Sequence, residues 1–242
     1  MNYENDLHKK LFEIVKKPSR LKSHPFMVVP SSFTKFSKDD LFKSDDSIHI
    51  LELGSGWGEF ALAWLEKNPT HEWLALEVKP DRIRNLQIEA EKKAISGLRI
   101  LQLNFSWFLE ELLPDNSFDL IIVNFPDPWP KRRHWKHRLV QSDFPARIAP
   151  LLRPGGKLHL ATDYSPYARR MLSVMRKTEL FEPVFTNPDY RRERPDDFPP
   201  TKFERSQIAQ GYQPYFQQWT LVDTNSKNTS IIKKKMIGRI HN

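Results

Sequence analysis

The sequence predicts an α/β fold: a doubly wound, mostly parallel sheet that is closed by an antiparallel strand. Two observations carry this prediction. Short apolar runs alternate with amphipathic segments from residue 48 onward, and a glycine-rich turn follows the first apolar run. Such alternation is typical of parallel βαβ units, which bind ligands at the carboxyl ends of their strands. Functional residues are therefore expected in the turns that leave these strands.

The expected elements follow one another along the chain. Parallel strands are expected at 48–53, 73–78, 98–103, 118–125 and 156–162, and helices at 59–67, 80–94, 143–152 and 164–177. Pro80 supports the second helix, because proline suits the first helical position. The closing antiparallel pair is expected from the apolar runs 181–185 and 215–222.

The 242 residues suffice for one α/β domain with a full core. We assign residues 48–222 to this domain. Residues 1–47 are expected to form an N-terminal extension, and the basic, polar tail 223–242 is expected to be solvated. The sequence is compatible with a monomer or a homodimer.

The chain is basic and contains no cysteine. Its 38 Lys and Arg exceed its 30 Asp and Glu, which gives a formal net charge of +8. Basic chains of this size commonly bind nucleic acid, anionic membranes or acidic partners. The lack of cysteine excludes disulfides, thiolate metal ligands and a thiol nucleophile. With no apolar span or signal-like segment visible, and no grouped metal ligands, we expect a cytoplasmic protein without a metal or a membrane anchor.

The turn L51-E-L-G-S-G-W-G58 indicates a nucleotide cofactor. Glycines tolerate positive φ and let a ligand approach the backbone; here they are Gly54, Gly56 and Gly58. The next residue, Glu59, would repel the diphosphate of a dinucleotide at the start of the helix. S-adenosylmethionine has no phosphate and carries an ammonium and a sulfonium, so this acid-flanked turn suits it better.

Two acids and one amide accompany the turn. Glu52 can meet the methionine ammonium, and Glu77 ends the second strand, where a carboxylate can accept both ribose hydroxyls. Either acid alone could be an ordinary strand-end residue, but both in register with the glycines favour a cofactor site. Asn104 follows the third strand and could bond the adenine edge, or it could cap the next helix.

The stretch N124-F-P-D-P-W-P-K-R-R-H-W-K-H-R138 leaves the fourth strand at its carboxyl end. Three prolines restrict its backbone, which should hold Asp127 and Trp129 for a substrate. Asp127 can accept from the N–H edge of a base, and Trp129 can stack on one. The alternatives are a turn residue and a core aromatic residue beneath a loop.

A basic run follows this corner. Its members are Lys131, Arg132, Arg133, His134, Lys136, His137 and Arg138, with Trp135 among them. A charge run is commonly a solvated face, but this one lies at the ligand-binding end of the sheet, which favours a phosphate-binding surface. Two further stretches return to this edge: A161-T-D-Y-S165 and the long loop 191–205.

With these motifs assembled, the chain resembles the bacterial tRNA (guanine-N7-)-methyltransferases over residues 48–211. The resemblance rests on L-E-L-G-S-G-W-G, F-P-D-P-W-P-K-R-R-H-W-K-H-R, A-T-D-Y-S-P-Y-A and T-K-F-E-R, of which the second and fourth are specific to that family. It implies a Rossmann-like class I methyltransferase. It further implies methyl transfer from S-adenosylmethionine to N7 of a guanine in the tRNA variable loop, at position 46.

The resemblance also implies residue roles. Glu52 and Glu77 are implied to bind the cofactor, and Asp127 is implied as the active-site acid at the junction of cofactor and substrate. Substrate contacts are implied for Lys131, Asp163, Thr201, Lys202, Phe203 and Glu204. RNA binding is implied for Arg133, His134, Trp135, Lys136, His137 and Arg138. At Asn104 the family usually has aspartate; asparagine keeps an acceptor and adds a donor.

Two other functions stay open from the sequence. Amino-group methyltransferases carry an Asx-Pro-Pro-aromatic corner where this chain has Pro-Asp-Pro-Trp. The second alternative is a basic RNA-binding module on an inactive scaffold, although the intact glycine turn argues against it.

Guanine N7 has an in-plane lone pair and no proton, so for the N7 reaction we expect Asp127 to orient the base rather than to act as a strong general base.

Overall fold

The structure is a computed structural model that describes residues 3–223, with the side chains of 9–105 and 108–223. Within this range the strands form a single eight-stranded sheet in the order β1-β4-β3-β2-β5-β6-β8-β7. They are β1 (Met27–Val28), β2 (His49–Leu53), β3 (Glu72–Glu77), β4 (Leu98–Gln102), β5 (Phe118–Asn124), β6 (Leu152–Thr162), β7 (Phe181–Pro183) and β8 (Tyr215–Leu221). Neighbouring strands are parallel except at β8, which is antiparallel to both β6 and β7.

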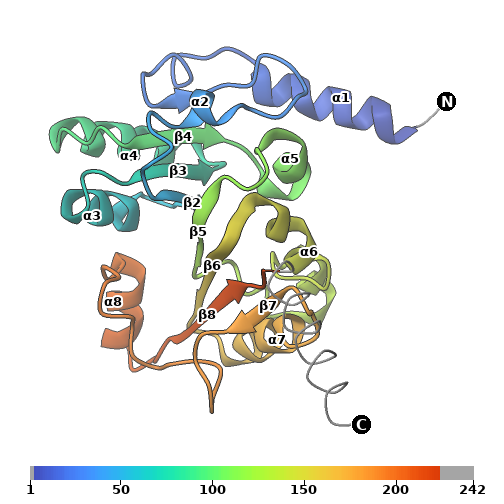
Figure 1. Cartoon of the computed structure of the whole chain (residues 1–242), viewed down its shortest axis with the longest axis vertical. Helices are drawn as coiled ribbons and strands as arrows, with labels where there is room; N and C mark the ends of the chain where they lie inside the picture. Colours follow the sequence, from blue (N-terminus) through green and yellow to red (C-terminus); the bar gives the residue numbers. More distant parts are fainter. Residues whose placement is uncertain (1–2, 224–242) are drawn as a thin grey trace, which may run out of the picture.

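Helices cover both faces of the sheet, with α3, α4 and α8 on one side and α5, α6 and α7 on the other (Figure 1). Their bounds are α1 (Tyr3–Lys16), α2 (Lys38–Leu41), α3 (Glu59–Lys67), α4 (Pro80–Lys92), α5 (Phe105–Leu112), α6 (Phe144–Ile148), α7 (Ser165–Met175) and α8 (Lys202–Ala209), with 3-10 helices η1 (Arg132–His137) and η2 (Ala149–Leu151). Buried apolar side chains form one cluster around Phe118 and Tyr167 and a second around Trp73 and Leu86. The doubly wound sheet and its antiparallel closing pair are thereby confirmed.

Helices α5 and α8 and strand β1 were not among the expected elements, and three of the expected features differ from the prediction. The helix expected at 143–152 is shorter: α6 ends at Ile148 and continues as η2, because Pro150 has no N–H for the helix ladder. Strand β6 begins at Leu152 rather than at 156, and a register shift opposite 118–120 accommodates its early start. The basic run, expected as a loop, folds into η1.

The N-terminal segment packs onto the sheet. Strand β1 pairs in parallel with β4, and Phe12 and Val15 of α1 are buried in the cluster around Phe118. The tail expected to be solvated, apart from residue 223, lies outside the described residues.

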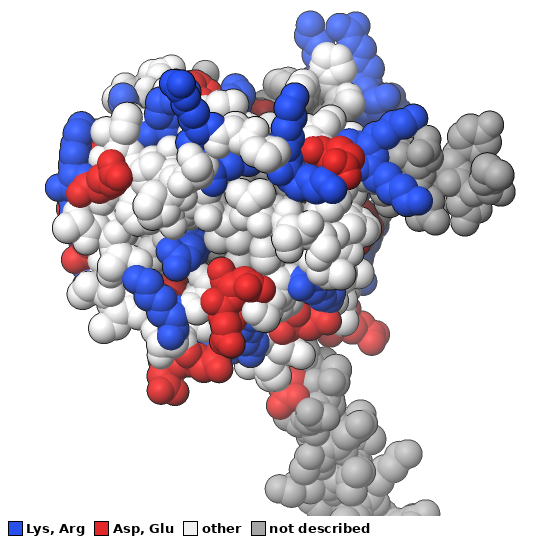
Figure 2. Space-filling view, turned by 90° about the horizontal axis from the view of Figure 1, so that it is seen from above, with Lys and Arg blue, Asp and Glu red and all other residues white. Residues whose placement is uncertain are grey.

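Figure 2, seen from the side of α1 and α2, shows Lys and Arg gathered mainly along one border and Asp and Glu along the other. No helix in the described part of the chain has both the length and the apolar character needed to cross a membrane.

Candidate active site

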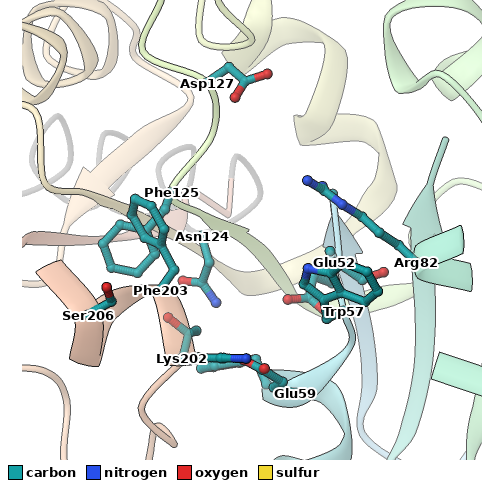
Figure 3. A pocket seen from close by; sticks show the side chains of 15 residues that line it. Glu52, Trp57, Glu59, Arg82, Asn124, Phe125, Asp127, Lys202, Phe203 and Ser206 are labelled. Carbon is teal, nitrogen blue, oxygen red and sulfur yellow. The ribbon is translucent and has the colours of Figure 1, made fainter. Parts of the chain in front are cut away.

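A cavity of about 420 Å³ opens where β2 and β5 end, between the glycine turn and the start of α8 (Figure 3). Glu52 and Asn124 line it from the two strands, and residues 54–57 line it from the turn. Asp127 borders it from the proline corner, across the opening from Glu52. The predicted cofactor turn and the predicted acidic corner therefore meet in one cavity.

The three glycines of the turn serve different purposes. Gly54, Gly56 and Gly58 all have positive φ, at 84°, 59° and 79°. A Cβ on Gly56 would meet nothing within 4 Å, so this glycine leaves room in the cavity. A Cβ on Gly58 would lie 2.2 Å from Cδ1 of Leu86, so this glycine lets α3 pack against α4. Only the first two of the glycines line the cavity.

This difference predicts that alanine at Gly58 affects mainly stability, whereas alanine at Gly56 affects mainly cofactor binding. Gly58→Ala should lower the free energy of unfolding by about 2–4 kcal/mol, because positive φ costs about 1 kcal/mol and the overlap with Leu86 adds more. Gly56→Ala should cost only about 1 kcal/mol in stability, but its Cβ enters the cavity and should weaken cofactor binding. Urea unfolding and cofactor titration of both variants test this; equal stability losses would contradict it.

Glu52 is the buried acid of the site. Its side chain is 2% exposed, and its Oε2 has no hydrogen-bond partner. Burial raises the pKa of Glu52 to about 8. Two neighbouring cavity groups, Ser55 Oγ and Asn124 Nδ2, are also buried without a partner. Because unpaired buried polar atoms are costly, the cavity floor fits a polar ligand that carries a cation for Glu52, as the ammonium of S-adenosylmethionine does.

Cofactor binding should release a proton from Glu52. With its pKa raised to about 8, the carboxyl is protonated in the free protein at pH 7, whereas a bound ammonium favours the carboxylate. Close to one proton should leave at pH 7, and affinity should rise as the pH increases from 6 towards 8. Calorimetry in two buffers of different ionisation enthalpy measures the release. Glu52→Gln is the matched control, and an unchanged proton release in that variant would refute the assignment.

Glu77 lies behind the turn rather than in the cavity lining. Its carboxylate accepts hydrogen bonds from the N–H groups of Gly56 (2.9 Å), Val78 (2.7 Å) and Lys79 (3.0 Å), and Arg82 lies 3.5 Å away. Glu77 thus fixes the turn to the end of β3. A contact with ribose requires the hydroxyls to replace one of these donors.

The proline corner has an unusual backbone. Phe125 and Trp129 have φ values of 49° and 41°, a left-handed region that bulky residues rarely adopt and that persists only where surrounding contacts enforce it. Arg138 provides such contacts: its Nε donates to the carbonyl oxygen of Pro128 at 2.7 Å and its Nη2 to that of Trp129 at 3.4 Å. Asp127, between the two strained residues, is exposed and borders the cavity.

Arg138 occupies a different place from the one that the sequence predicted. It was expected on the RNA-binding surface, but it is only 6% exposed. Its guanidinium stacks on the rings of Trp135 and Tyr167, each 4.9 Å from the ring centre. The two carbonyl acceptors and these two rings stabilise the positive charge of the Arg138 guanidinium inside the protein. Arg138 therefore supports the corner from a largely buried position.

The rest of the basic run is displayed on η1. Arg133, Trp135, Lys136 and His137 are exposed, and His134 is half-buried. The rings of His134 and His137 lie 5.6 Å and 5.3 Å from the ring of Trp129. Both histidines therefore contact Trp129 at the corner, and the exposed members, His137 included, form a basic surface that follows the corner.

The start of α8 closes the other side of the cavity. Thr201 Oγ1 accepts from the N–H of Glu204 at 2.9 Å, and Glu204 is 2% exposed and ion-paired with Arg194 at 2.6 Å. The side chains of Thr201 and Glu204 thus form a capping box, a structural use that the sequence prediction did not include. The N–H of Lys202 donates to Glu59 Oε2 at 3.0 Å, which joins α8 to α3.

Besides Gly58, Glu77 and Glu204, three further residues predicted for the cofactor or substrate do not line this cavity. Lys131 is exposed just before η1. Asp163 follows β6 and is half-buried, and burial raises the pKa of its carboxyl above the ordinary value. Asn104 follows β4 and is half-buried. Within the described residues, His, Asp and Glu side chains form no group of three or more that could hold a metal ion.

Several cavity residues were missed by the sequence prediction. Trp57 in the turn and Arg82 on α4 face the cavity, as does the ring of Phe125, which lies 5.2 Å from that of Phe203 (Figure 3). Asn124, the last residue of β5, could have been found from its place at a strand end. Trp57 and Arg82 carry no such signal, because only the packing of α4 against the turn brings them together.

The sheet order, the acid-flanked glycine turn and the cavity at the strand ends define a class I methyltransferase, which uses S-adenosylmethionine as methyl donor. A family model described as "Putative methyltransferase" matches residues 46–216. The crystal structure of the 16S rRNA methyltransferase KamB has a TM-score of 0.54 to this chain at 15% identity, and the match covers 74% of this chain and 90% of that one. At this identity, the likeness supports the fold alone.

Two bacterial relatives are closer in sequence. A tRNA (guanine-N(7)-)-methyltransferase of Leptospira interrogans is 39% identical over 200 residues, which cover 83% of this chain and 91% of the relative. A protein of the same name from Nitrosomonas europaea is 40% identical over 163 residues, which cover 67% of this chain and 71% of the relative. The chain belongs to the tRNA (guanine-N(7)-)-methyltransferase family.

Proposed function

We propose that this enzyme transfers a methyl group to N7 of a guanine in the variable loop of tRNA, in the cytoplasm. The observation that carries the proposal is the shared cavity: the buried side chain of Glu52, whose Oε2 has no hydrogen-bond partner, and the exposed side chain of Asp127 both border it. The exposed basic surface of η1 follows the same corner. The names of the relatives support the choice of tRNA and of guanine N7.

S-adenosylmethionine supplies the activated methyl group when it is bound. Glu52 would hold the ammonium of the methionine part, while Gly54 and Gly56 leave space beside the backbone. Glu77 and Asn104, which end or follow the next two strands, would serve the ribose and the adenine. The residues present therefore fit this cofactor.

Asp127 would orient the guanine. Its carboxylate can accept from guanine N1–H and N2–H, two donors that adenine does not offer together, so the contact selects guanine. N7 has a lone pair in the ring plane and no proton, so no base has to remove one before the transfer. The work of the protein is alignment and the exclusion of water, and the Phe125–Phe203 ring pair provides an apolar wall for this.

Exposed cations of η1 would hold the RNA backbone near the cavity. Arg133 and Lys136 are exposed on this helix, and cations that neutralise phosphates dominate RNA affinity and make it depend on salt. Such contacts position the substrate without reading its bases. Guanine selection therefore belongs to Asp127 and affinity to the basic surface.

A tRNA transcript made with 7-deazaguanosine tests the atom that is methylated. This base keeps the N1–H and N2–H edge but has carbon in place of N7. The proposal predicts binding close to that of the ordinary transcript and no methyl transfer. Transfer that persists would point instead to an amino-group methyltransferase, which needs an exocyclic amine and not N7.

A further inference from the structure

A second hollow, of about 470 Å³, lies between η1 and α7, apart from the active-site cavity. Trp135, Lys136, Arg138 and Gln141 line it from η1 and the segment that follows, and Pro166, Arg169 and Arg170 line it from α7. None of these seven residues lines the active-site cavity. The family motifs do not include the α7 arginines, and the proposed reaction makes no use of them.

Trp135 is held in place without being buried. Its ring lies over the guanidinium of the buried Arg138 at 4.9 Å, and its carbonyl oxygen accepts from Gln141 Nε2 at 2.6 Å. Its Nε1 donates to the carbonyl oxygen of Pro130 at 3.4 Å. The side chain nevertheless remains 45% exposed. An aromatic ring that is fixed on one face and exposed elsewhere is a platform on which a nucleobase can stack.

The cations around this ring have no acidic partners. Among the described residues, Lys136, Arg169 and Arg170 form no ion pair with a carboxylate; Arg169 donates instead to Ser165 Oγ at 2.9 Å. Some other arginines do have such a partner, namely Arg82 with Glu77, Arg147 with Glu110, Arg153 with Asp119, Arg176 with Asp189 and Arg194 with Glu204. Uncompensated cations that gather around one hollow favour an anionic ligand.

We propose that this hollow binds a second nucleotide of the RNA substrate, distinct from the guanine that is methylated. Its base stacks on Trp135, and its phosphate lies between Lys136 and the arginines of α7. A planar ring beside three cations matches a nucleotide, which combines a π-face with a phosphate. The inference rests on the proposed function and extends the RNA-binding surface from η1 to α7.

The site is coupled to the active-site corner through Arg138. The same guanidinium that lies against Trp135 also donates to the corner at Pro128 and Trp129. A nucleotide on Trp135 and a guanine at Asp127 would therefore sit on opposite sides of one buried arginine. Recognition of two unstacked bases at once is possible in looped RNA and not in an intact duplex, which agrees with a loop as substrate.

Binding of an unmodified tRNA transcript, measured at several salt concentrations, tests the site. The Arg169→Ala/Arg170→Ala double variant should bind more weakly and should lose about 1.5 units from the slope of log K against log salt. Trp135→Ala should raise Kd about tenfold, as the loss of one stacked base does, whereas Trp135→Phe should retain most of the affinity. Lys177→Ala, which removes an exposed charge just beyond the end of α7, is the control and should change neither quantity.

Each outcome decides between the claims. A double variant with the Kd and salt slope of Lys177→Ala, while thermal unfolding shows it folded, would overturn the second site. If the wild-type protein binds tRNA with the predicted dependence on these residues but does not methylate it, the proposed function is refuted and the second nucleotide site is retained. If the wild-type protein binds no tRNA, both the proposed function and the second nucleotide site are refuted.

Discussion

Replacing Asp127 with alanine should lower kcat for tRNA methylation by at least about a hundredfold and leave the Kd for S-adenosylmethionine nearly unchanged. The proposed function gives this carboxylate a charge-assisted contact with the guanine edge and the positive charge that guanine gains on methylation. Loss of a group that acts at the transition state commonly costs about 10²–10³ in kcat. Asp127 is exposed at the cavity mouth, opposite Glu52, so cofactor affinity should depend mainly on Glu52.

The controls separate charge from shape. Asp127→Asn keeps the volume and one acceptor oxygen, so it should fall between wild type and alanine. Asp143→Ala removes an exposed acid before α6 that makes no capping hydrogen bond with its side chain, and it should have no effect on either constant. Parallel losses of rate and cofactor affinity in Asp127→Ala would mean that Asp127 belongs to the cofactor site instead.

Replacing Arg138 with methionine should lower kcat by at least about tenfold without changing the salt slope of tRNA binding. Methionine fills a similar volume but cannot donate to the carbonyl oxygens of Pro128 and Trp129. The left-handed backbone at Trp129 would then lose these hydrogen bonds, and Asp127 would be less well positioned. Stability should also fall, by about 1.5–3 kcal/mol for each charge-assisted hydrogen bond that is lost.

Arg133→Ala is the matched comparison for this prediction. Arg133 is exposed, so its loss should raise the Kd for tRNA and take about one unit from the salt slope. Arg138→Met should show the opposite pattern, with a changed rate and an unchanged slope. If the two variants lose equal slope, Arg138 contacts RNA, as the basic run alone had suggested.

The sequence predicted the elements well wherever local pattern decides the structure. Helix α3 has the predicted bounds, because glycine, an apolar face and a final lysine mark both of its ends. The fully buried strands β2 and β3 were found to within one residue from their apolar runs. The glycine turn and the proline corner were expected at one edge of the sheet, because parallel strands place their carboxyl ends together.

Long-range partners decided what the sequence could not show. Arg138 turns inward because Tyr167 on α7 offers a ring and Pro128 a carbonyl oxygen, and neither relation is visible within a basic run. Glu204 forms an ion pair with Arg194 and caps the start of α8, the helix to which it belongs. The separate uses of Gly56 and Gly58 depend on where α4 lies.

The most direct test of the central claim is the product of the reaction. Purified protein would be incubated with methyl-labelled S-adenosylmethionine and a tRNA transcript that lacks modification, and the digested RNA would be analysed by nucleoside mass spectrometry. The account predicts that the label appears as 7-methylguanosine, confined to the variable loop, and that it forms at least about a hundredfold more slowly with Asp127→Ala. Label in another nucleoside, or in protein, would contradict it.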